Sequence, residues 1–474
     1  MFREYYNEET QTLNLPHNFN NELKELPDGI KKIIFLEKYM EEQHKENYKL
    51  SLFNFKINNL PSTLTHIYFG YYFNQPVDNL PENLTNLTFG NSFNQPVDNL
   101  PVNLTNLNFG NSFNQPVDNL PANLLNLTFG NSFNQLVDNL PANLLNLTFG
   151  YYFNQPVDNL PINLTNLSFK NEFLKPLDDF SFKNSFNQPV DNLPANLTNL
   201  TFGMSFSQPV DNLPANLISL TFDYNFNQPV DNLPANLKNL TLGHYFDQPV
   251  DNLPLNLTNL TFRGSYNQSI DNLPSKLTNL TLGNLFNKPV DNLPTNLINL
   301  TFGNFFNQRV NNLPTNLINL TFGNFFNQRV NNLPANLINL TFGYSFNQLV
   351  DNLPANLKKL TLGEDFNQPI NNLPANLIIL TLGPKFNQPV DILPINLKYL
   401  EVFSNFSMIN ELPNSVEYLF LNFHYHPFSN KIIDNLNFNI KEIIVKKTNY
   451  INYIKKIPFG CILIDKLTGE KITM

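Results

Sequence analysis

The amino-acid sequence predicts a β-rich repeat solenoid with one parallel sheet and little helix. From Phe53 to Phe173 an aromatic anchor recurs every 20 residues, and the spacing resumes at Phe186 and runs to Phe406, with Tyr266 at one position. The intervening sequence is a nearly constant FNQPVDNLPANLTNLTFGNS. A fixed period of this length is typical of stacked repeats. Two prolines in most units leave little room for a helix.

One unit, residues 93–112, shows how each turn is built. Leu107 and Phe109 are predicted to share the inward face of a short strand, while Asn106 and Asn108 point outward, because side chains alternate along a strand. Gly110 then ends the strand. A single unit cannot bury its own leucine and phenylalanine side chains, so successive strands are expected to pair in parallel at about 4.8 Å and to bury one continuous core.

Three regions are expected along the chain. Residues 1–52 form an N-terminal cap, with a degenerate repeat at 19–36 and a polar insertion at 37–52. Tandem repeats occupy residues 53–405, with one truncated unit at 173–185. Residues 406–474 hold degenerate repeats and a C-terminal cap, whose anchors Phe406, Phe428 and Tyr450 are about 22 residues apart. Atypical terminal repeats are what capping requires.

Composition excludes several classes of protein. Charged residues make up 14% of the chain and the net charge is −9, with no basic run, which argues against nucleic acid and anionic membranes as partners. Cys461 is the only cysteine, which fits a reducing compartment. The N-terminus lacks the apolar core of a secretory signal, and no stretch approaches the roughly 18 apolar residues of a membrane span. We expect an intracellular, cytoplasmic protein.

These repeats resemble FNIP repeats, which are leucine-rich-repeat-like units named for an F-N-x-P start and known from social amoebae and the giant viruses that infect them. The motif FNQPVDNLP…NLTFG matches strongly over about residues 53–406. The resemblance implies a right-handed leucine-rich-repeat-like stack with its strands on one face. Many viral members are similar in carrying an F-box-like segment before the repeats, but repeat-like sequence already begins at Phe19 here. The asparagine also follows the aromatic residue, so an asparagine ladder in the usual place is not assumed.

An aspartate recurs before each Leu-Pro and raises the question of calcium binding. Stacked carboxylates one turn apart could hold calcium, or each could accept backbone N–H bonds in its turn. Asn311, Asn331 and Asn371 occupy the same position, which indicates that an acceptor suffices and that no metal is needed. The file is Asp78, Asp98, Asp118, Asp138, Asp158, Asp191, Asp211, Asp231, Asp251, Asp271, Asp291, Asp351 and Asp391.

Other candidate sites have simpler explanations. Outward threonines and asparagines could bind ice or a repetitive polymer, but β-propensity on a solvated face explains them better. Residues 424–426 (His-Tyr-His) are predicted to form a polar loop, and Cys461 is predicted to pack in the core. Neither a phosphate loop nor a catalytic nucleophile motif is found, so we expect no enzyme and no cofactor. Ile298, Ile318, Ile338 and Ile378 predict an apolar patch suited to protein partners.

The two residues after each repeat glycine vary most, so any binding specificity is expected there. Aromatic residues on a rigid scaffold are good anchors for a partner. The candidates are Tyr71, Tyr72, Tyr151, Tyr152, Tyr224, His244, Tyr245, Phe305, Phe325 and Tyr344. The sequence therefore predicts a non-enzymatic protein-interaction scaffold, with a substrate-recruiting arm for host ubiquitination and an ice- or polymer-binding array as alternatives.

Overall fold

A computed structural model describes residues 2–42, 45–169, 185–388, 392–403, 412–422, 436, 438–446, 454 and 456–472. The chain divides into two units, Met1–Tyr245 and Phe246–Met474. Apart from Ser185, the predicted truncated unit at 173–185 lies outside the described residues, as do Asp391, residues 424–426 and the anchors Phe406, Phe428 and Tyr450.

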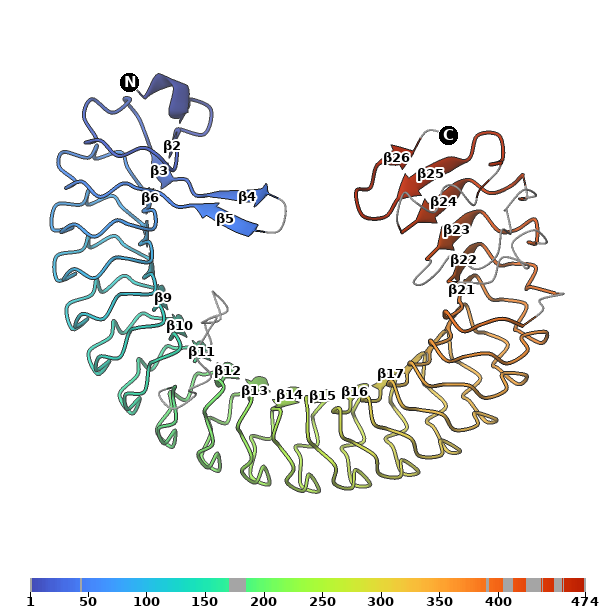
Figure 1. Cartoon of the computed structure of the whole chain (residues 1–474). Coiled ribbons are helices and arrows are strands. Elements are labelled where there is room, and N and C mark those ends of the chain that lie inside the picture. Colours follow the sequence, from blue (N-terminus) through green and yellow to red (C-terminus); the bar gives the residue numbers. More distant parts are fainter. Residues whose placement is uncertain are drawn as a thin grey trace. The chain divides into compact units, whose positions relative to one another are not determined.

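Unit 1 is a stack of short strands joined by irregular turns (Figure 1). Its elements are the 3-10 helix η1 (Arg3–Tyr5) and strands β1 (Tyr6–Asn7), β2 (Thr12–Leu15), β3 (Lys32–Phe35), β4 (Lys38–Glu42), β5 (Lys45–Lys49), β6 (His66–Tyr68), β7 (Asn86–Thr88), β8 (Asn106–Asn108), β9 (Asn126–Thr128), β10 (Asn146–Thr148), β11 (Asn166–Ser168), β12 (Asn199–Thr201), β13 (Ser219–Thr221) and β14 (Asn239–Leu242). Strands β2, β3 and β6 to β14 pair in parallel in chain order.

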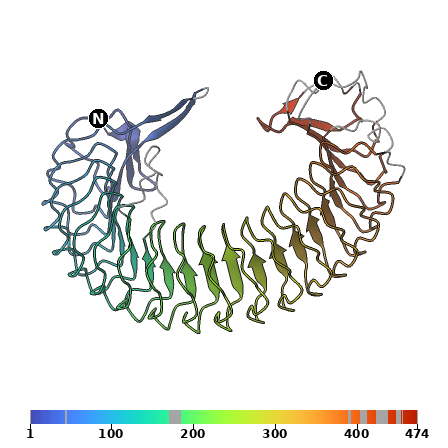
Figure 2. The same ribbon diagram turned by 60° about the horizontal axis from the view of Figure 1, so that its bottom comes forward.

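Unit 2 repeats the same design. Its strands are β15 (Asn259–Phe262), β16 (Asn279–Thr281), β17 (Asn299–Thr301), β18 (Asn319–Thr321), β19 (Asn339–Thr341), β20 (Lys359–Thr361), β21 (Ile379–Thr381), β22 (Tyr399–Val402), β23 (Tyr418–Leu421), β24 (Glu442–Val445), β25 (Ile462–Asp465) and β26 (Lys471–Ile472). Strands β15 to β25 are parallel neighbours in chain order. Figure 2 shows the strands within each unit side by side and pointing the same way. The predicted parallel β-solenoid with almost no helix is confirmed.

The alternation predicted for each strand is present, and it builds an aromatic core. In β8, Leu107 is buried and Asn106 and Asn108 are more accessible. Phe109 follows the strand and is also buried, and its ring lies 3.8 Å from that of Phe113 in the same turn. Each buried phenylalanine contributes about 1.5–3 kcal/mol. The constant residues of the repeat therefore supply the core.

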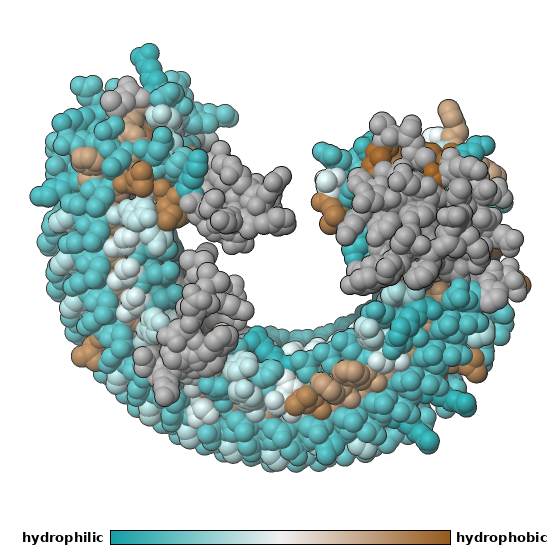
Figure 3. Space-filling view, in the orientation of Figure 1, coloured by the Kyte–Doolittle hydropathy of each residue, from teal (hydrophilic) through white to brown (hydrophobic). Residues whose placement is uncertain are grey.

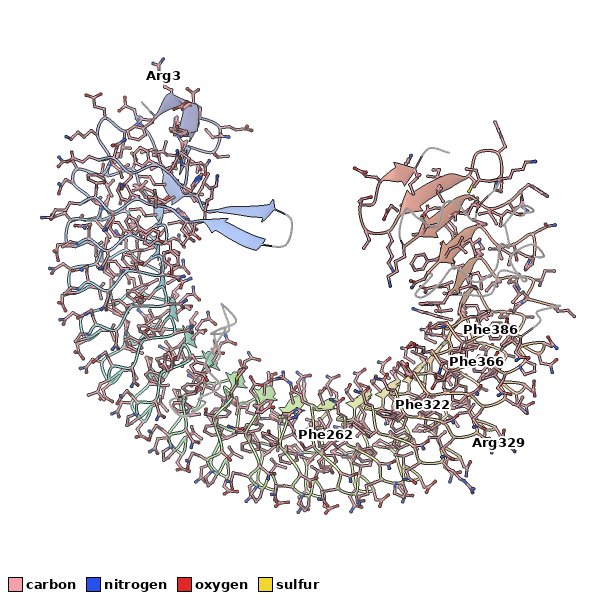
Figure 4. All side chains as sticks on the ribbon, in the orientation of Figure 1. Arg3, Phe262, Phe322, Arg329, Phe366 and Phe386 are labelled. Atoms are coloured by element: carbon pink, nitrogen blue, oxygen red, sulfur yellow. The ribbon has the colours of Figure 1, made fainter. Side chains whose placement is uncertain are left out.

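The same aromatic columns continue from turn to turn. In unit 1 the rings of Phe89 and Phe109 are 5.6 Å apart, and those of Phe93 and Phe113 are 6.1 Å apart. In unit 2, Figure 4 shows Phe322, Phe366 and Phe386 within the thickness of the stack and Arg329 at its outer edge. Strands lie on one side of each stack because their inward side chains must face these columns.

The ends of the two stacks depart from the repeat. Strand β1 pairs with β2 in the antiparallel sense, and β26 does the same with β25. Between β3 and β6, where the sequence predicts an insertion, β4 and β5 form a separate antiparallel hairpin that projects from the strand side of unit 1 (Figure 1). Strand β2 adds a turn before the degenerate repeat at 19–36, which the sequence analysis did not identify.

Candidate functional site

The variable pair after each glycine is held by a constant backbone ladder. The second residue of each pair donates its N–H to the carbonyl of the first residue of the pair one turn earlier. Ser112 N lies 2.9 Å from Asn91 O, and Phe305 N lies 2.9 Å from Asn284 O. The backbone is therefore the same in successive turns, while the side chains that it presents differ.

In unit 1 the predicted aromatic residues form separate small clusters. The rings of Tyr71 and Tyr72 meet edge to face at 4.9 Å, and those of Tyr151 and Tyr152 do so at 5.0 Å. Tyr72 is exposed, whereas Tyr71, Tyr151 and Tyr152 are half-buried. The two clusters lie four turns apart, so they do not form one continuous surface.

A third cluster in unit 1 joins two neighbouring turns. The ring of Tyr224 stacks on His244 at 4.7 Å and meets Tyr245 edge to face at 4.9 Å. A hydrogen bond with Tyr245 raises the pKa of the Tyr224 hydroxyl. These three predicted residues are brought together.

In unit 2 the same positions carry exposed apolar side chains in consecutive turns. Leu285, Phe305 and Phe325 are 45%, 49% and 50% exposed, and the rings of the two phenylalanines lie 4.9 Å apart. We call these three residues the apolar strip. Figure 3 shows a hydrophobic patch in the same region of unit 2, near β16 and β17. Contiguous exposed apolar side chains of this kind mark interaction surfaces.

Beyond the apolar strip the variable pairs become polar. Tyr344 is exposed, and its pKa is raised by the nearby charge of Glu364 and by a hydrogen bond to that side chain. Asp365 forms an ion pair with Lys385 at 2.6 Å. The apolar strip therefore has a charged neighbour at one end.

A second surface of unit 2 is a groove with a volume of about 990 Å³. Ile318, Ile338 and Ile378 line it together with Lys358 and Lys398. Each residue follows the Asn-Leu pair of its own turn, and we call this surface the Ile–Lys groove. Three of the four residues of the predicted isoleucine patch line it, whereas Ile298 does not, and the two lysines were not singled out from the sequence. The other lining residues are Asn316, Asn336, Asn356, Asn376, Ile395, Asn396, Ser415 and Glu417.

Backbone hydrogen bonds fix the positions of the groove residues. Ile338 N donates to Ile318 O at 2.9 Å, Lys358 N to Ile338 O at 2.9 Å, and Ile378 N to Lys358 O at 2.8 Å. The same ladder continues through Lys398. These side chains therefore project from a continuous, regular backbone.

The aspartate file accepts hydrogen bonds, but its donor differs from the expected one. The side-chain amide of Asn119 donates to Asp98 Oδ1 at 3.0 Å, and Asn139 donates to Asp118 Oδ1 at 3.0 Å. The predicted role as an acceptor is present, and the donor in these turns is a side-chain amide of the next turn. Among the described residues no group of three His, Cys, Asp or Glu side chains is placed to hold a metal ion.

Asparagines also form ladders on the strand face and beside the core. Asn126 Nδ2 donates to Asn106 Oδ1 at 2.5 Å, and Asn146 repeats this contact with Asn126. The asparagine that follows each anchor forms another ladder, in which Asn114 Oδ1 accepts from Asn134 N at 2.9 Å. Because the strand-face amides bond to each other, they offer fewer donors to ice or a polymer.

Two features remain, the single cysteine and the question of a membrane-spanning helix. Cys461, which was predicted to pack in the core, is only half-buried, and this partial burial raises the pKa of its thiol to about 11. In the part of the chain that is described, no helix has the length and apolar character needed to cross a membrane.

Comparison with known proteins agrees with the repeat and with the fold described above. The family model for the FNIP Repeat matches residues 53–92, 73–99, 93–132, 113–152, 133–171, 186–222, 209–245, 226–262, 246–285, 326–365, 346–385 and 366–402. CroV588, a circular LRR protein of the giant virus CroV, is 37% identical with a TM-score of 0.71 over 96% of this chain and 72% of that chain. No curated protein matches the sequence.

Two further solved structures are similar at lower identity. YopM from Yersinia enterocolitica WA-314 is 22% identical with a TM-score of 0.44, covering 89% of this chain and 93% of that one. TLR13, solved in a complex with ssRNA13, is 18% identical with a TM-score of 0.48, covering 81% and 68%.

Proposed function

Because the chain belongs to the FNIP repeat family, whose leucine-rich-repeat-like stack is typical of protein–protein interaction, we propose that it is a non-enzymatic scaffold that binds a partner protein through the apolar strip. The exposure of Leu285, Phe305 and Phe325 carries this proposal. Each side chain leaves about half of its surface in water.

The cost of that exposure supports a binding role. The same repeat position carries Ser92, Ser112 or Ser132 in other turns, so the fold does not require an apolar residue there. Burying a large apolar side chain contributes about 1.5–3 kcal/mol, and Phe305 and Phe325 would contribute this to a complex. Aromatic anchors that are fixed before binding lose little conformational entropy.

A comparison of three variants tests the proposal. Tagged wild-type chain, the double variant Phe305→Ser/Phe325→Ser, and the control Leu349→Ser are used to capture proteins from amoebal lysate. Leu349 is a matched control because it is 50% exposed in the same unit but lies outside the variable pair. We expect one stoichiometric protein with the wild type and the control, and its loss with the double variant.

Two outcomes would count against this function. Equal recovery of the partner protein by the double variant would mean that the partner does not bind through the apolar strip. The absence of any stoichiometric protein would remove the support for a cytoplasmic scaffold. Recovery of cullin-ligase components would instead favour the substrate-recruiting alternative.

A further inference from the structure

The Ile–Lys groove lies away from the apolar strip. Ile318 directly precedes β18, whereas Phe325 follows the last residue of that strand by four positions. The two surfaces therefore lie at opposite ends of β18, the strand that borders both, and from there the strip extends toward β16 and the groove toward β23. A ligand of the groove need not contact the apolar strip.

We infer that the Ile–Lys groove is a second binding surface and that it takes an extended acidic segment with aliphatic side chains from a partner protein. Its chemistry follows from what the fold leaves available. The side-chain amides of Asn336 and Asn376 donate to Thr315 O and Ala355 O, each at 3.0 Å. The side chains left for a ligand are therefore chiefly isoleucines and lysines.

The charge of the groove is unlike that of the chain as a whole, whose net charge is −9. Glu417 is compensated by Lys441, whose ammonium lies 2.7 Å from its carboxylate. Lys358 and Lys398 form no ion pair with any residue that the structure describes, although the charge of Lys398, after that of Lys441, also helps to lower the pKa of Glu417. Two ammonium groups between branched aliphatic side chains complement carboxylates between aliphatic side chains. A nucleic acid would leave the isoleucines without apolar partners.

The spacing of the groove limits the form of its ligand. The lining residues come from six successive turns, from Asn316 to Glu417. At about 4.8 Å per turn the groove is about 24 Å long, which matches seven or eight residues of extended peptide. Lys358 and Lys398 are two turns apart, or about 9.6 Å. Carboxylates three residues apart in a polyproline II segment are about 9.3 Å apart on one face.

Binding of synthetic peptides to the full chain tests the inference. The probe is a fluorescein-labelled nine-residue peptide with glutamate at every third position and valine or proline between. Two matched probes carry glutamine or lysine in place of glutamate. Fluorescence anisotropy is measured with the wild type, with Lys358→Glu/Lys398→Glu, and with the control Lys238→Glu, which changes the same repeat position in unit 1.

We expect saturable binding of the acidic probe to the wild type and to the control. The Lys358→Glu/Lys398→Glu variant should bind about tenfold more weakly, as expected for two surface ion pairs. It should also bind the lysine probe better than the wild type does. Adding salt should weaken the binding of the acidic probe.

Several results would overturn the inference. These are no saturable binding of the acidic probe, equal binding by the groove variant, or lysine-dependent binding of a single-stranded RNA probe. Unchanged unfolding temperatures show that the variants fold. The variant Phe305→Ser/Phe325→Ser should bind the acidic probe normally, so failure of the groove and failure of the apolar strip can be distinguished.

Discussion

At the scale of single residues, Tyr266 shows how one turn adapts to a departure from the repeat. It is fully buried at a position that holds phenylalanine in neighbouring turns, and its hydroxyl donates to Ser269 O at 2.9 Å. Ser269 stands where most turns have proline. The added hydroxyl is therefore matched by a local acceptor.

Replacing Tyr266 by phenylalanine should lower the free energy of unfolding by about 1 kcal/mol, because the Ser269 carbonyl loses its donor. Urea unfolding followed by circular dichroism measures this. Tyr72→Phe is the control, since Tyr72 is exposed. Equal stability of Tyr266→Phe and the wild type would contradict the role of this hydrogen bond.

The same residue predicts a dependence on pH. Burial raises the pKa of Tyr266 above its usual range, and Asp251 and Asp247 add to the rise. The folded chain holds this proton more tightly than the unfolded chain does. The stabilisation is therefore complete below the unfolded pKa of about 10 and is lost as the pH rises above it. Unfolding measured on both sides of that pH should show a steeper loss for the wild type than for Tyr266→Phe.

The repeat glycines tolerate a side chain less well than comparison of the repeats suggests. A Cβ on Gly110 would lie 2.1 Å from the carbonyl oxygen of Gly90 in the preceding turn. Gly110→Ala should cost about 1–3 kcal/mol, because backbone must shift. Ser112→Ala, an exposed change in the same turn, should stay within about 0.5 kcal/mol. Asp223 and Arg263 at equivalent positions indicate that a turn can adjust, so a neutral Gly110→Ala would mean that adjustment is easy.

At the scale of the element, the asparagine after each anchor joins one turn to the next. Asn114 Oδ1 accepts from Asn134 N at 2.9 Å and from Gln135 Nε2 at 3.1 Å. In unit 2 an aspartate does the same, since Asp247 Oδ1 accepts from Asn267 N at 2.8 Å. An oxygen acceptor at this position is therefore the common requirement.

Asn114→Ala should destabilise its neighbouring turn by about 1 kcal/mol, since the partly buried Asn134 N–H loses its acceptor. Hydrogen exchange should show reduced protection of the Asn134 amide. Asn114→Asp should retain protection, as the Asp247 turn indicates. Loss of protection in both variants would mean that the amide group itself is needed.

At the scale of the whole molecule, the open ends of a parallel sheet need protection. Strand β26 covers the edge of β25, and an uncovered edge is a template for pairing with another chain. Removing residues 467–474 should therefore produce dimers or larger species in light scattering. Removing only residues 473–474 should leave the oligomeric state unchanged. A monomeric longer truncation would show that β26 is not the protecting strand.

Much of the fold could be predicted from the sequence because it depends on contacts within one turn. The inward positions of Leu107 and Phe109 follow from strand alternation, and stacking follows from the period. The donors to the aspartates could not be predicted, because Asn119 reaches Asp98 only after one turn lies on the next. The candidate residues divide in the same way. Phe305 and Phe325 were identified from variation between repeats, but their contact required the register of neighbouring turns.

The sequence by itself determined the repeat, the inward core, the family and the variable pair after each glycine, because each is encoded in a segment of about 20 residues. Only the tertiary structure decided which variable residues form a continuous surface. Lys358 and Lys398 are 40 residues apart in the chain, and they line one groove because stacked turns place them about two strand spacings apart.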